Sequence, residues 1–151
     1  MDALGVLDGQ HAVFFERNNG REPLFIYLLA LTFSLIGATP FAIRLTAAIC
    51  GAATVVTTYW LVRETFRFDA SLHANGATHP AVWYAAWTAL FLTVSYWHIS
   101  FSRLGFRAIT LPLMATIAFG LFWRAWRRLH NERHLPWVDL LLCGVFIGMS
   151  F

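Results

Sequence analysis

The sequence predicts an all-α fold, a polytopic transmembrane helical bundle with a short juxtamembrane helix. Of its 151 residues, 58% are hydrophobic and only 13% are charged. Soluble domains average about 45–50% apolar and about 25% charged residues. The apolar residues also occur in long runs that short polar stretches separate. Both observations are typical of a protein embedded in a membrane.

The first part of the chain, 1–23, is polar and is predicted to be an external loop. Residues 2–15 fit a short amphipathic turn on a membrane surface and a solvated loop equally well. The next run, 24–37, has about 14 residues, and a helix of that length rises roughly 21 Å, short of the roughly 30 Å hydrocarbon core. We therefore expect 24–37 to be a juxtamembrane or re-entrant helix, with a full crossing as the alternative.

Longer apolar segments follow, and they are predicted to span the membrane: 41–62, 81–101 and 108–124. Aromatic residues near both ends of 81–101 fit the two membrane interfaces. A final apolar run, 137–151, stops within a helix and is predicted to be a truncated span. We therefore expect the chain to be a fragment of a larger membrane protein.

Charge patterning orients these segments and excludes some functions. Lysine is absent, the net charge is only +3, and no basic stripe lies on a soluble face, which argues against nucleic-acid binding. The basic cluster over 124–133 predicts a cytoplasmic location for that loop. The hinge at 102–107 then faces outward. Cys50 and Cys143 lie inside apolar runs without metal-ligand spacing, so we interpret them as packing residues and predict no metal site at either of them.

Several arginines fall on the side of the membrane where the charge rule predicts few cations. Arg44, Arg103 and Arg107 lie at the predicted outer edge, and Arg21 joins them if 1–23 is also outside. An ionisable group at that depth is by default a functional-site hypothesis. The anion that suits arginine is a phosphate or pyrophosphate, which the guanidinium binds in a bidentate manner. The alternative is that these side chains extend to ordinary lipid phosphates.

Three motifs then point to a family. NNGREPLFIYL at 18–28, FAIRL at 41–45 and HISFSRLGFRAI at 98–109 resemble segments of the membrane glycosyltransferases of the GT-C class. Within that class the chain is similar to family 39, which groups protein O-mannosyltransferases with lipid A aminoarabinose transferases. The order and spacing of the motifs carry more weight than any one of them.

The resemblance implies a partial GT-C transmembrane domain in a plasma membrane of the bacterial (inner) type. It implies transfer of a hexose, such as mannose, from a polyprenyl-phosphate donor to an acceptor on the outer face, with inversion at the sugar. The donor phosphate would be bound by Arg44, Arg103, Arg107 and Arg21. Glu22, Asn19 and His98 are the candidates for binding the acceptor or substrate. A divalent metal remains an option for Glu22, although a carboxylate favoured by a helix dipole is the simpler interpretation, and His98 is more simply a packing residue.

The chain departs from the family in its catalytic acid. Relatives place an Asp-Glu pair after their first transmembrane helix, as general base for the acceptor hydroxyl. Neither that helix nor that pair occurs in this sequence. The catalytic residue is therefore expected upstream of this chain, and the fragment alone is predicted to be inactive. The competing interpretation is a non-catalytic membrane module, a transporter or lipid-binding segment, whose arginines contact lipid headgroups.

Overall fold

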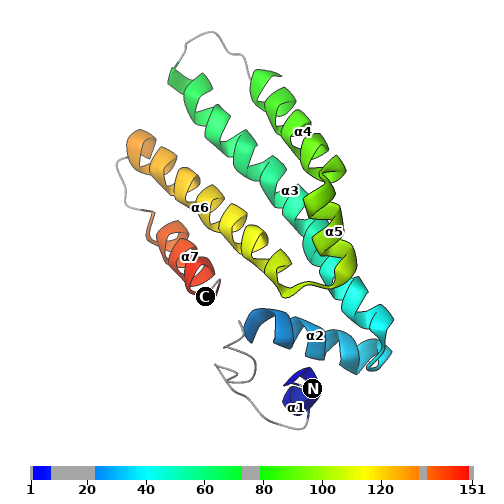
Figure 1. The fold of residues 1–151 in the computed structure, drawn as a ribbon. Coiled ribbons are helices and arrows are strands. Elements are labelled where there is room, and N and C mark those ends of the chain that lie inside the picture. The colour runs from blue at the N-terminus through cyan, green and yellow to red at the C-terminus, as the bar shows by residue number, and fades with distance from the viewer. Residues whose placement is uncertain (1, 8–22, 73–78, 133–135, 150–151) are drawn as a thin grey trace.

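The structure is a computed structural model, and it describes residues 2–7, 23–72, 79–132 and 136–149. Within these ranges every regular element is helical (Figure 1), which confirms the predicted all-α class for this part of the chain. The elements are α1 (Asp2–Leu7), α2 (Pro23–Ile36), α3 (Pro40–Leu72), α4 (His79–Val94), α5 (Tyr96–Leu104), the 3₁₀ turn η1 (Arg107–Ile109), α6 (Thr110–Glu132) and α7 (Trp137–Gly148). Of the predicted loop over 1–23, residues 2–7 form α1, and 8–22 lie outside the described residues.

The long helix α3 is the centre of the arrangement. Figure 1 shows α4 and α5 running back along one side of α3, whereas α6 runs along the other side. The helix α7 packs against α6. The helix α2 runs across the direction of α3, near the end where α3 begins. Here α2 packs on α1 through Ala3, Val6, Ile26 and Ala30. The bundle therefore has one end that α2 covers and one end that α2 leaves free.

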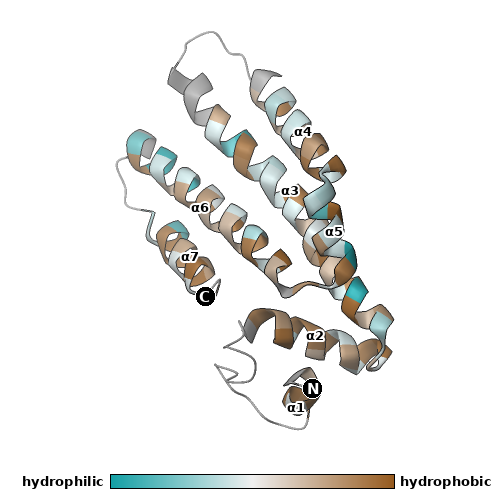
Figure 2. Ribbon diagram, in the orientation of Figure 1, coloured by the Kyte–Doolittle hydropathy of each residue, from teal (hydrophilic) through white to brown (hydrophobic). Residues whose placement is uncertain are grey.

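One described helix is long and apolar enough to cross a membrane, the 27-residue stretch Pro40–Phe66 of α3. Only 28% of its most apolar window is buried inside the protein, so most of this apolar surface faces outward. Large side chains also face outward from α4, where Trp83 and Phe91 are 62% and 67% exposed. Figure 2 shows apolar residues along the whole of α2 and most of α7. A large exposed apolar surface of this kind indicates association with a membrane.

The segment 81–101, which the sequence predicts as one span, is divided at Ser95 into α4 and α5. Ser95 has extended backbone angles (φ −64°, ψ 123°), and its carbonyl accepts the N–H of Ile99 at 3.0 Å, as the first residue of a new helix does. The preceding Thr93 and Val94 are β-branched and favour helix interiors less than straight side chains do. The predicted span 81–101 therefore consists of two helices that meet at Ser95.

Two helices continue well beyond the apolar runs that predicted them. The predicted spans end at 62 and 124, whereas α3 extends to Leu72 and α6 to Glu132. Arginine and glutamate are good helix formers, so a charged residue ends an apolar run without ending the helix. Figure 2 shows the hydrophilic end of α6 lying beside the start of α7. The extensions bring charged side chains of different helices together.

Small residues set the spacing between the helices. A Cβ added at Gly120 of α6 would lie 2.0 Å from the ring of Trp60 in α3, so no larger residue fits there. The main core joins α2, α3, η1 and α6, and its buried members are Phe25, Ala47, Cys50, Ile109, Leu113 and Met114. The close packing fixes α6 against α3, and thereby fixes both ends of the bundle.

Candidate functional site

The first predicted phosphate-binding residue, Arg44, is held in the second turn of α3 by the way that helix begins. Gly37 ends α2 with a left-handed backbone (φ +88°) that favours glycine. The Thr39 hydroxyl accepts the N–H of Ala42 at 3.2 Å and caps α3, with Pro40 as its first residue. The tight turn and the cap fix the direction in which α3 leaves α2, and so the position of Arg44.

The second predicted phosphate-binding residue, Arg103, lies in the last turn of α5. This helix, like α2, ends at a glycine. Gly105 has φ +72°, and a Cβ there would lie 2.7 Å from Cγ2 of Ile43, the residue before Arg44. A side chain at 105 would therefore force α5 away from α3. Because glycine has no side chain, the end of α5 can pack directly against the first turns of α3.

Between the start of α3 and the end of α5 lies an open hollow of about 420 Å³. It is lined by Arg44, Ala48, Ser102 and Arg103. Both arginine side chains are exposed. Ser102 donates its hydroxyl hydrogen to the carbonyl of Ile99 at 2.9 Å, which leaves its oxygen able to accept a hydrogen bond. Neither arginine has a carboxylate partner among the residues that the structure describes. The hollow therefore presents two guanidinium groups to whatever enters it.

The other predicted site residues are not all brought to this hollow. His98 places its Nε2 atom 3.1 Å from the carbonyl oxygen of Gly51, so its described contact joins α5 to α3. Arg107 belongs to η1, but its side chain lies outside the described part of the structure. Arg21, Glu22 and Asn19 fall within 8–22, which is likewise outside it.

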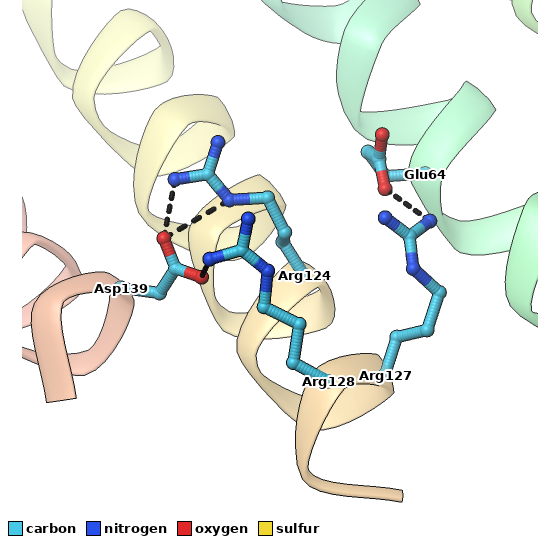
Figure 3. A network of polar contacts seen from close by, with 5 residues as sticks. All are labelled: Glu64, Arg124, Arg127, Arg128 and Asp139. Carbon is cyan, nitrogen blue, oxygen red and sulfur yellow. Dashed lines mark hydrogen bonds and ion pairs between the residues drawn. The ribbon is translucent and has the colours of Figure 1, made fainter. Parts of the chain in front are cut away.

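A second polar cluster lies at the other end of α3, and sequence reasoning missed its pairing (Figure 3). Asp139, in the first turn of α7, is 1% exposed and binds two arginines of α6. Its Oδ1 atom accepts the Nε–H of Arg124 at 3.0 Å, and its Oδ2 atom accepts from Nη1 of Arg128 at 2.9 Å. Arg127 points to the opposite side of α6 and pairs with Glu64 of α3. The available signal was an aspartate inside an apolar run that follows a cluster of arginines.

The two clusters differ in what they offer a ligand. At the second cluster each described carboxylate is already bound to arginine, so these charges hold α3, α6 and α7 together. At the hollow the guanidinium groups remain available, and paired guanidinium groups suit the oxygens of phosphate. In the described ranges, no group of three or more His, Cys, Asp or Glu side chains is placed to hold a metal ion.

Comparison with known proteins gives no family: no family model, no curated protein and no solved structure matches the chain.

Proposed function

We propose that this chain is part of a multi-pass integral-membrane glycosyltransferase. It would transfer a hexose from a polyprenyl-phosphate donor to an acceptor on the outer face. The observation that carries the proposal is the hollow in which Arg44 and Arg103 converge beside Ser102. Two of the three sequence motifs, 41–45 and 98–109, contain these three residues. The donor phosphate is the anion assigned to the two guanidinium groups.

The charge at this end of the bundle supports an anionic ligand. Two exposed cations of like sign share one hollow, and no described carboxylate offsets them. Like charges held close together repel each other, and an anion between them removes that repulsion. Phosphate oxygens accept several charge-assisted hydrogen bonds at once, so one phosphate satisfies both side chains.

The surroundings of the hollow suit a lipid-linked donor. Arg44 lies within Pro40–Phe66, the helix able to cross a membrane, and close to its first residue. Apolar side chains of the neighbouring α2, Leu31 and Leu35, are 60% and 77% exposed. The transverse direction of α2 in Figure 1 agrees with a juxtamembrane helix at the bilayer surface. A polyprenyl chain would then lie in the bilayer while its phosphate reaches the arginines.

In the proposed reaction the acceptor hydroxyl oxygen attacks the anomeric carbon of the sugar from the face opposite the phosphate. The bond between that carbon and the phosphate oxygen breaks, and the electron pair leaves with the polyprenyl phosphate. Arg44 and Arg103 would bind the phosphate as its negative charge increases, which is electrostatic stabilisation of the leaving group. The hydroxyl proton passes to a carboxylate base, which the family resemblance assigns to a segment upstream of this chain.

The test is binding of undecaprenyl phosphate, the lipid product that keeps the phosphate assigned to the arginines, by the full-length protein in nanodiscs. Arg44→Ala should lower the affinity at least tenfold, since a hydrogen bond to a charged group contributes about 1.5–3 kcal/mol. Arg63→Ala is the matched control, because Arg63 is an exposed arginine of the same helix, far from the hollow. Wild-type affinity in the Arg44 variant would refute the phosphate role.

A second candidate is a non-catalytic lipid-binding or transport module, in which the arginines hold ordinary lipid headgroups. One observation favours it: the acidic side chains that the structure describes, Glu64 and Asp139, are both paired with arginines at the far end of α3. A base for the acceptor would have to come from elsewhere. Competition by phosphatidylglycerol at equal concentration separates the two candidate functions. Phosphatidylglycerol should displace undecaprenyl phosphate from a lipid-binding or transport module, but not from the glycosyltransferase. An upstream coding segment with an apolar helix followed by Asp-Glu would favour the enzyme.

A further inference from the structure

A separate cavity lies between α6 and α7, and its lining is entirely apolar. Its volume is about 430 Å³, and it is lined on α6 by residues from Leu111 to Phe122 and on α7 by Cys143 and Ile147. The lining residues of α6 span roughly 16 Å along the helix axis. The cavity is therefore an elongated apolar slot, and a shape of this kind matches a hydrocarbon chain better than a compact ligand.

One end of the slot adjoins the charged cluster around Asp139. Asp139 lies one helical turn before Cys143 on α7, and Arg124 follows Phe122 by two positions on α6. A single carboxylate is shared there by two guanidinium groups, so the cluster carries an excess positive charge. The Arg128 side chain is 47% exposed, and it binds Asp139 through its Nη1 atom. A cation with free donors therefore lies above an apolar slot.

We propose that the slot between α6 and α7 binds one acyl chain of an anionic phospholipid whose phosphate is bound by Arg128. The acyl chain gains an apolar environment along α6, and the phosphate compensates the excess charge that Asp139 leaves. Basic pockets between membrane helices are suited to anionic headgroups, and arginine adds bidentate hydrogen bonding. The site is independent of the proposed glycosyltransferase reaction, since its lining residues belong to α6 and α7 and its charged end, at Arg128, lies far from Arg44.

The test measures lipid retention by the full-length protein, by native mass spectrometry after exchange into phosphatidylglycerol or phosphatidylcholine. One phosphatidylglycerol per chain should be retained at least tenfold more tightly than phosphatidylcholine. Arg128→Gln should remove that preference, and Ala115→Leu should lower retention of both lipids by filling the slot. The matched controls are Arg63→Gln, which removes an exposed arginine outside the slot, and Ala86→Leu on the exposed face of α4; both should retain phosphatidylglycerol as the wild type does.

Four results would overturn the proposal. Equal retention of the two phospholipids by the wild type would mean that Arg128 selects no headgroup. An equal loss in Arg63→Gln would mean that diffuse charge attracts the lipid, without a site at Arg128. Unchanged lipid retention in Ala115→Leu would mean that the slot holds no acyl chain. A change of oligomeric state in that variant would mean that the slot accommodates another protein surface.

Discussion

The two ends of α3 use arginine in opposite ways. At the end nearest α7, arginines of α6 bind Asp139 and Glu64 and join three helices. At the other end, Arg44 and Arg103 surround an open hollow and have no carboxylate among the described residues. The comparison teaches that an arginine near the end of a long apolar helix is informative only together with its partner. An arginine whose donors are taken up by a carboxylate stabilises the fold, whereas an arginine with donors left free by the described residues, as at the hollow and in part at Arg128, is available to an anion.

The largest effect is expected from Asp139→Ala, because it leaves Arg124 and Arg128 without their carboxylate. Removing one partner from a buried ion pair costs about 3–5 kcal/mol, and the partial exposure of both arginines places the expected loss at the lower end of that range. The free energy of unfolding in mixed detergent micelles would measure it. Asp139→Asn is the control that keeps the shape of the side chain. If the asparagine variant were as stable as the wild type, the ion pairs would not hold α7 to α6.

A smaller effect is expected midway between the two ends, from Gly120→Ala. The added Cβ would lie 2.0 Å from the ring of Trp60, and overpacking of this kind typically costs about 1–3 kcal/mol. Gly144→Ala is the matched control, because an added Cβ there meets nothing within 4 Å and alanine favours a helix over glycine. The unfolding midpoint Tm should fall in the first variant only. Equal Tm values would show that α6 does not depend on this contact with α3.

The sequence predicted the helical class and, in 41–62, most of the one described helix that is long and apolar enough to cross a membrane, because apolar composition and run length encode both. That 81–101 and 108–124 also span stays a prediction. Its charge pattern also selected Arg44 and Arg103, which the structure brings to one hollow. It did not predict the pairing of Glu64 with Arg127, since that contact joins helices that are distant in the chain. The break at Ser95 was missed because the apolar run continues through it, and backbone conformation decides the break.

A third prediction concerns the spacing of the hollow itself. In Gly51→Ala the new Cβ would lie 2.7 Å from Cβ of Ser102, so α5 must move away from α3. Because the contact is less severe than that at Gly120, we expect a loss of about 1 kcal/mol in the free energy of unfolding. The affinity for undecaprenyl phosphate should fall several-fold, since Ser102 and Arg103 move together. Gly120→Ala is the comparison, and an equal loss of affinity there would mean that general destabilisation, and not the position of α5, lowers binding.

The smallest effect on stability is expected from Arg103→Gln. Its side chain is exposed and has no ion pair with any described residue, so the free energy of unfolding should change by less than about 0.5 kcal/mol. Binding of undecaprenyl phosphate should nevertheless fall at least tenfold, because the lost guanidinium is one of two that face the hollow. Unfolding and binding are measured on the same preparation, so the two effects can be separated. A loss of stability similar to that of Asp139→Ala would mean that Arg103 has a partner within the protein, and the contrast between the two ends of α3 would then be wrong.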